Sequence, residues 1–99
     1  MPNPPPTDLR GYFDRDGLLL LWPAKGRAEK RQIALEWIAE HFEMGRTYHE
    51  KEVNAVLKSL HTFNDPAFLR RELVDRRFLT RNPDGSEYRK TLGEGCEGG

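Results

Sequence analysis

The stretch over residues 65–90 constrains the fold of this chain most, because it joins a helix start directly to a β-hairpin. Asp65 is of the type that accepts backbone N–H groups at an N-cap, and Pro66 suits the first helical position. Leu69 and Leu73 then share one helical face. The pattern predicts a short helix that begins at Asp65 and buries this face.

A β-hairpin is expected directly after this helix. Phe78 and Leu79 begin a strand, and residues 87–90 form the return strand. Between them, Asn82-Pro83-Asp84-Gly85 is a turn tetrad that places glycine where a positive φ is needed. The tip of the hairpin is therefore predicted at residues 83–85.

Two further helices are predicted upstream. Residues 25–42 carry apolar side chains at helical spacing, and Gly45 is expected to stop this helix. Thr47 and Glu50 match a Thr-x-x-Glu capping box, so a second helix is expected from Thr47. The apolar run over residues 18–22 fits an extended arm or a strand. This order indicates an α+β fold of the winged-helix type, with three helices, a C-terminal β-hairpin wing and an N-terminal extended arm or strand.

The chain has 99 residues, enough for one modest domain. We expect a disordered Pro-rich tail over residues 1–11, a winged-helix domain over residues 12–90, and a disordered Gly/Glu-rich tail over residues 91–99. The only cysteine, Cys96, cannot form an internal disulfide, and the longest apolar run is too short to span a bilayer. These features predict a cytoplasmic protein without a membrane partner.

The formal net charge is zero, which counts against a protein that depends on strong electrostatic attraction to nucleic acid. The charges are unevenly distributed, however. Residues 65–90 hold seven basic and five acidic groups, whereas residues 32–64 hold three basic and five acidic groups. A small basic excess therefore lies on the predicted third helix and hairpin.

Several short motifs occur together along the chain. They are Asp16-Gly17, Trp22-Pro23-Ala24-Lys25, Tyr48, Glu50-Lys51-Glu52-Val53-Asn54, Leu69-Arg70-Arg71-Glu72-Leu73-Val74-Asp75 and Asp84-Gly85-x-x-Tyr88. In this combination the chain resembles domain-of-unknown-function family 2087 over roughly residues 12–90. The resemblance implies a bacterial source, a winged-helix-like fold and an association with transcription regulators, and it brings no catalytic residues.

Six residues of the predicted third helix and hairpin are candidates for contact with nucleic acid. They are Arg70, Arg71, Arg81, Tyr88, Arg89 and Lys90. Arg71 falls roughly opposite the buried leucines and Arg70 on the flank, so a helix in the major groove would present both to phosphates or guanine edges. The four hairpin residues would hold the wing against the sugar-phosphate backbone.

Each candidate also has a plainer interpretation. Arg70 and Arg71 can pair with Glu52, Glu72 or Asp75 and so hold helices together. Exposed hairpins also carry basic residues for solubility and for protection of the sheet edge. The sequence leaves these alternatives open.

The leading prediction is a transcription regulator or accessory factor that binds double-stranded DNA, with a homodimer formed through the apolar arm over residues 12–22. The alternative is a protein-interaction or sensor module of a regulatory system, which keeps the fold without binding DNA. The zero net charge favours this alternative.

Enzyme activity is not expected. A catalytic site near His49, Glu50 and Asn54 would need a pocket that the sequence does not indicate. No cofactor is predicted either, because the spacing of His41, His49 and His61 matches no compact metal-binding motif.

Overall fold

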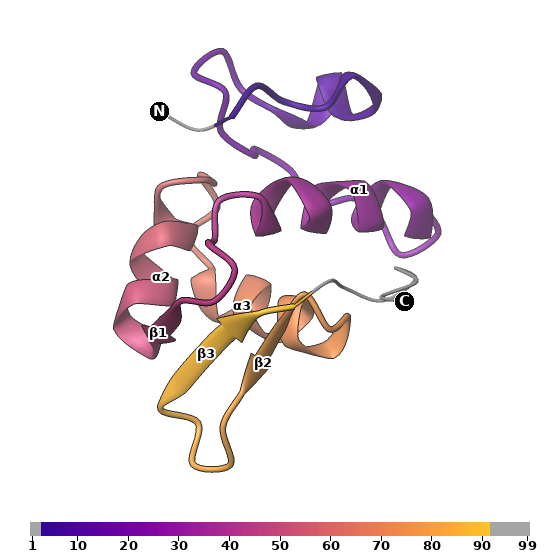
Figure 1. The fold of residues 1–99 in the computed structure, drawn as a ribbon. Coiled ribbons are helices and arrows are strands. Elements are labelled where there is room, and N and C mark those ends of the chain that lie inside the picture. Colours follow the sequence, from indigo (N-terminus) through magenta and orange to yellow (C-terminus); the bar gives the residue numbers. More distant parts are fainter. Residues whose placement is uncertain (1–2, 92–99) are drawn as a thin grey trace.

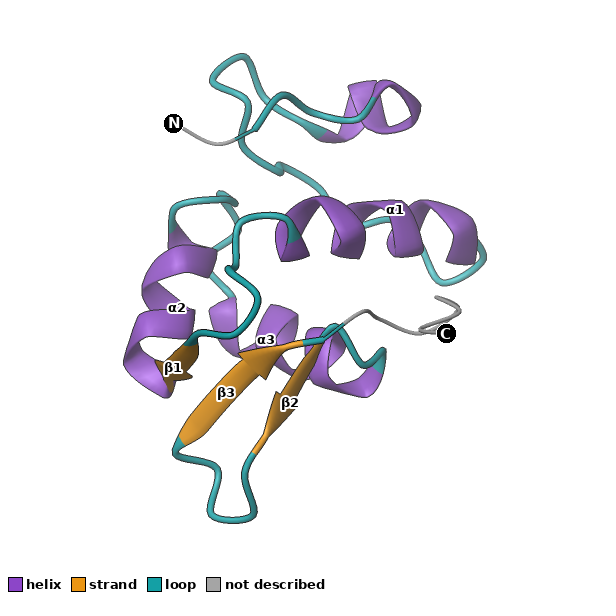
Figure 2. Ribbon diagram, viewed as in Figure 1, coloured by secondary structure: helices purple, strands orange, loops and turns teal. Residues whose placement is uncertain are grey.

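The computed structural model describes residues 3–91, which form a small α+β domain (Figure 1). Its elements are, in order, the 3₁₀ helix η1 (Thr7–Tyr12), α1 (Ala28–Ala39), β1 (Thr47–His49), α2 (Glu50–Lys58), α3 (Pro66–Asp75), β2 (Leu79–Arg81) and β3 (Glu87–Lys90). The strands form an antiparallel sheet in the order β1-β3-β2 (Figure 2). The expected α+β class is confirmed, and the sheet has a third strand that was not predicted.

The predicted start of α3 is confirmed. The Asp65 carboxylate accepts a hydrogen bond from the Phe68 N–H at 3.1 Å, and Pro66 is the first helical residue. Leu69 and Leu73 are fully buried on the inner face of the helix. Local capping and apolar spacing therefore suffice to place this helix.

The end of α3 is closed by two backbone hydrogen bonds. The Phe78 N–H donates to the Leu73 carbonyl at 2.8 Å, and the Arg77 N–H donates to the Val74 carbonyl at 3.0 Å. This is the Schellman arrangement, which requires left-handed backbone geometry just after the helix. Arg77 takes that position with φ 65°, where glycine has no steric cost. The helix therefore ends on a strained arginine.

The hairpin has the predicted tip. The Gly85 N–H donates to the Asn82 carbonyl at 2.9 Å, and Gly85 has φ 77°. On its other edge β3 pairs with β1, so that Tyr48 lies opposite Tyr88. Both tyrosines are buried, and the sheet therefore closes one side of the core.

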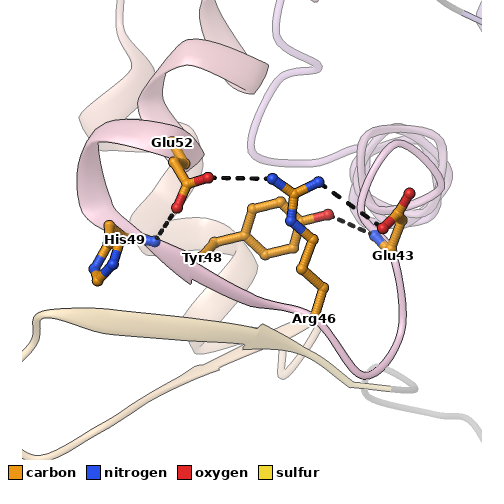
Figure 3. Close-up of polar contacts among 5 residues, drawn as sticks. All are labelled: Glu43, Arg46, Tyr48, His49 and Glu52. Carbon is orange, nitrogen blue, oxygen red and sulfur yellow. Dashed lines mark hydrogen bonds and ion pairs between the residues drawn. The ribbon is translucent and has the colours of Figure 1, made fainter.

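The predicted helix start at Thr47 is wrong. Strand β1 begins there instead, and α2 begins at Glu50. The expected capping box is replaced by one in which the Glu52 carboxylate accepts the His49 N–H at 3.0 Å (Figure 3). Pairing with β3 and burial of Tyr48 outweigh the local capping preference of the threonine.

Arg46 ties the loop before β1 to α2 (Figure 3). Its guanidinium lies 3.1 Å from Glu52 Oε2 and 3.8 Å from Glu43 Oε2, and it stacks over the Tyr48 ring at 4.6 Å. The His49 N–H bond, with a smaller contribution from Arg46, holds the pKa of Glu52 below its ordinary value. The Glu52 carboxylate is therefore occupied by its contacts with Arg46 and His49, which join this loop to α2.

The helix α1 is shorter than the predicted helix over residues 25–42. It ends at Ala39, because the N–H groups of His41 and Phe42 bond only three residues back and tighten the chain. Gly45, with φ 81°, lies in the turn before β1 and not at the helix end.

Residues 3–12 pack on α1, although disorder was expected over residues 1–11, of which the first two lie outside the described residues (Figure 1). Leu9 is fully buried, and the Trp37 indole N–H donates to the carbonyls of Asn3 and Pro4 at 3.2 Å. The helix α1 carries apolar residues on two sides because it is covered on two sides.

The apolar arm reaches the turn between α2 and α3. Leu19 is fully buried, its N–H donates to the Leu60 carbonyl at 2.8 Å, and its carbonyl accepts the Thr62 N–H at 3.0 Å. The two leucines that follow it are 43% and 54% exposed. Leu19 thus anchors this stretch of the arm to the core.

The predictions of a C-terminal tail and of no membrane partner can be compared with the described residues only in part. The predicted tail over residues 91–99 lies outside the described residues, except for Thr91. Within residues 3–91, no helix has the length and apolar character needed to cross a membrane.

Candidate nucleic-acid interface

A cavity of about 390 Å³ lies between α3 and the β2–β3 hairpin. Its lining residues are Ala67, Arg70, Arg71, Val74, Asp75, Arg81 and Tyr88. Three arginines and one aspartate give this lining a positive formal charge. An anion that entered the cavity would therefore meet guanidinium groups from two different elements.

Most of the lining comes from one face of α3. Ala67, Arg71 and Val74 follow one another at steps of four and three residues, which places them on the same side of a helix. Leu69 and Leu73 point the other way, into the core. The amphipathic pattern that buries the leucines therefore also turns the basic side chains toward the hairpin.

The hairpin contributes Arg81 and Tyr88, which lie opposite each other on β2 and β3. Residues paired in this way share one face of a sheet. The structure places Tyr88 differently from the exposed wing position expected for it, because its side chain is only 1% exposed. Tyr88 belongs to the core and to the wall of the cavity, where it cannot lie along a phosphate backbone.

Arg70 is held in place by α2. Its guanidinium donates to Asn54 Oδ1 at 2.5 Å and lies 3.6 Å from Glu50 Oε1. The expectation that an acidic residue would pair with it is met by Glu50 and not by Glu52, which binds Arg46. Arg70 therefore joins the two helices and lines the cavity at the same time.

Arg71 and Arg81 are exposed, as predicted for Arg71. Among the described residues, neither guanidinium has a hydrogen-bond or ion-pair partner, and Asp75 forms no ion pair with either of them. These two groups are thus available to a ligand without the loss of an existing contact.

Arg89 does not line the cavity with the other three arginines. It pairs with Thr47 and Thr80 across the sheet, and its Nε donates to Thr47 Oγ1 at 3.1 Å. Because side chains alternate along a strand, Arg89 lies on the face opposite Arg81. Lys90 shares the face of Arg81 but lies half-buried beside Leu79, at the other end of the hairpin.

The residues considered for catalysis have structural partners. Glu50 and Asn54 both contact Arg70, and the His49 N–H is bound by Glu52. In the part of the chain that the structure describes, no group of three or more His, Cys, Asp or Glu side chains could hold a metal ion.

Sequence reasoning missed four members of this site. Ala67 and Val74 line the cavity, and Glu50 and Asn54 position Arg70. The steps of three and four residues from Ala67 along α3 could have identified the first two. The contact from α2 depends on tertiary packing and had no sequence signal.

Comparison with known proteins agrees with the motif pattern. No curated protein and no solved structure matches the chain. A family described as "Uncharacterized protein conserved in bacteria (DUF2087)" matches residues 19–90, a range that includes every residue lining the cavity. The match covers more than half of the chain, which therefore belongs to this bacterial family.

Proposed function

We propose that this chain is a winged-helix domain that binds double-stranded DNA as a transcription regulator or accessory factor. The order helix, strand, two helices and hairpin, with β1 on the edge of the sheet next to β3, supports the winged-helix assignment. In such a domain α3 would enter the major groove and the β2–β3 hairpin would be the wing.

The observation that carries the proposal is the convergence of Arg70, Arg71 and Arg81 around the cavity between α3 and the hairpin. A duplex that receives a helix in its major groove brings its phosphates against the neighbouring hairpin. Guanidinium groups match phosphate oxygens in charge and in planar geometry. Arg71 and Arg81 would make the contacts, with Arg70 fixed beside them by α2.

A salt titration of binding to mixed-sequence duplex DNA tests this assignment. We compare the wild type with Arg71→Ala/Arg81→Ala, because neither side chain has a partner among the described residues. Loss of two phosphate contacts should lower the slope of log affinity against log salt by about 2 and weaken binding about tenfold or more per arginine.

Two matched controls locate the effect. Arg15→Ala removes an exposed arginine from the turn within the arm, and Arg89→Ala removes one from the opposite face of the hairpin. Both should keep the wild-type slope. Absence of DNA binding at low salt, or an unchanged slope in the double variant, would contradict the proposal.

A second candidate function is a protein-interaction or sensor module. The engagement of Arg70 by α2 and the zero net charge favour it. Folded protein that does not bind DNA at low salt in the same titration would support this function.

A homodimer through the arm would use the exposed side chains of Leu20 and Leu21, since Leu19 is buried in the core of its own subunit. Sedimentation velocity of Leu20→Glu/Leu21→Glu beside the wild type tests this arrangement. A wild type that remains monomeric at high concentration would exclude it.

A further inference from the structure

Asn3 and Pro4, in the Pro-rich part of the chain, are bound by polar groups at the C-terminal end of α1 and just beyond it. The Trp37 indole N–H lies 3.2 Å from the carbonyl oxygens of both Asn3 and Pro4. The Asn3 N–H donates to His41 Nε2 at 2.9 Å. Trp37, near the end of α1, and His41, just after the helix, thus bind successive backbone groups of the segment.

The bound segment is rich in proline and has polyproline II angles at Pro6. Residues 4–6 are three consecutive prolines, and Pro6 has φ −62° and ψ 141°. Prolines carry no N–H, and a polyproline II segment forms no internal hydrogen bonds, so its carbonyls accept from an external donor. Proline-rich ligands of this kind are recognised by aromatic grooves. Trp37 supplies an indole donor to the carbonyls of Asn3 and Pro4.

The receiving side chains also have partners other than the segment. His41 Nδ1 lies 2.9 Å from the Trp37 carbonyl, which requires a proton on Nδ1 and leaves Nε2 as the acceptor that the Asn3 N–H needs. The His41 and Trp37 rings also meet edge to face at 4.8 Å, and Phe13 contacts the indole at the same distance. These contacts hold the indole and the imidazole independently of residues 3–6.

We propose that the surface formed by Trp37 of α1 and by His41, two residues beyond the helix, is a binding site for proline-rich polyproline II segments, which residues 3–6 fill in cis. A proline-rich segment of another protein enters the site when residues 3–6 leave it. Trp37 and His41 lie inside the range matched by the family, residues 19–90, whereas the occupying segment lies outside it. This inference does not depend on DNA binding. It gives the chain a second class of partner, proline-rich proteins, which would bind away from the α3–hairpin cavity.

The cis segment should compete strongly with a ligand in trans, because its tether gives it a high effective concentration. We therefore weaken it in the full chain with Pro4→Gly/Pro5→Gly/Pro6→Gly, which removes the stiffness of the segment and leaves α1 unchanged. The probe is a synthetic peptide, MPNPPPTD, and the control peptide is MPNGGGTD. The readout is the NMR signal of the Trp37 indole N–H, assigned through Trp37→Phe, with Trp22 as an internal reference.

In the triple-glycine variant, MPNPPPTD should shift the Trp37 signal and saturate it, while MPNGGGTD and the Trp22 signal should show no such change. The wild type should need at least tenfold more peptide for the same shift. Trp37→Phe, which keeps an aromatic ring but removes the donor, should release residues 3–6 in the otherwise unaltered chain. An unmoved Trp37 signal in the triple-glycine variant, or residues 3–6 still bound without their prolines, would overturn the proposal.

Discussion

Replacement of His61 tests how the turn that presents α3 is held. This side chain is 4% exposed and lies between the end of α2 and the start of α3. Its Nδ1 lies 2.6 Å from the Leu57 carbonyl, and its Nε2 accepts the Asp65 N–H at 2.9 Å. His61→Leu keeps the approximate size of the side chain, makes it apolar and removes both bonds. The result should be a loss of stability without a large cavity.

The magnitude follows from what the two partners lose. Each hydrogen bond contributes about 0.5–1.5 kcal/mol, and a buried group left without a partner costs about 1–3 kcal/mol. The Leu57 carbonyl keeps a second donor, the Leu60 N–H at 3.0 Å, whereas the Asp65 N–H has no other acceptor among the described contacts. The lost bond to Leu57 and the orphaned, partly buried Asp65 N–H together give about 1.5–4.5 kcal/mol.

Urea unfolding measures this loss as a difference in the free energy of unfolding at constant m-value. Thr62→Ala is the matched control, because Thr62 is the exposed neighbour in the same turn, and it should stay within about 0.5 kcal/mol of the wild type. A loss below about 1 kcal/mol for His61→Leu would refute the reasoning. It would mean that the turn keeps its geometry without the imidazole.

Two further predictions concern the ends of the two helices beside this turn. Arg77→Gly should raise the free energy of unfolding by about 0.5–1 kcal/mol, because glycine adopts φ 65° without strain. Urea unfolding measures this change. A decrease would mean that the arginine side chain contributes a stabilising contact. Stability should also fall as the pH drops through the ordinary pKa of a glutamate, 4.5, because the lowered pKa of Glu52 makes the unfolded chain bind protons more readily than the folded one. Glu52→Gln should flatten this pH dependence, and equal slopes for variant and wild type would contradict the role assigned to the His49 N–H bond.

Local sequence signals predicted α3 and the hairpin well because each is stabilised within itself. Asp65 caps its own helix, and Gly85 closes its own turn. Strand β1 was missed because it exists only through pairing with β3, far along the chain. The order of the Pro-rich segment was missed for the same reason, since it depends on the Trp37 indole. Local sequence patterns therefore miss those elements that form only through contacts with distant segments.

In the candidate site, too, local patterns predicted some features, and contacts between distant segments decided the others. The helical period correctly placed Arg71 on the outer side of α3. The alternation of side chains along a strand also separates Arg89 from Tyr88, and sequence alone contains this distinction. The burial of Tyr88 required knowledge of its partner Tyr48, and the restraint on Arg70 required the packing of α2 against α3. Periodicity finds which residues share a face, and packing decides what that face meets.

The two proposed sites lie on opposite sides of α1. The Pro-rich segment covers the side of α1 that faces away from the sheet, and the hairpin extends from the other end of the molecule (Figure 1). A ligand that displaced residues 3–6 would therefore leave the α3–hairpin cavity open, because no residue of the segment lines it. A domain with both activities would link DNA to a proline-rich protein, and neither ligand would exclude the other by contact. The peptide titration repeated with DNA-bound protein measures this independence directly: equal peptide affinities mean two separate sites, and unequal ones mean that α1, which packs against α3, couples them.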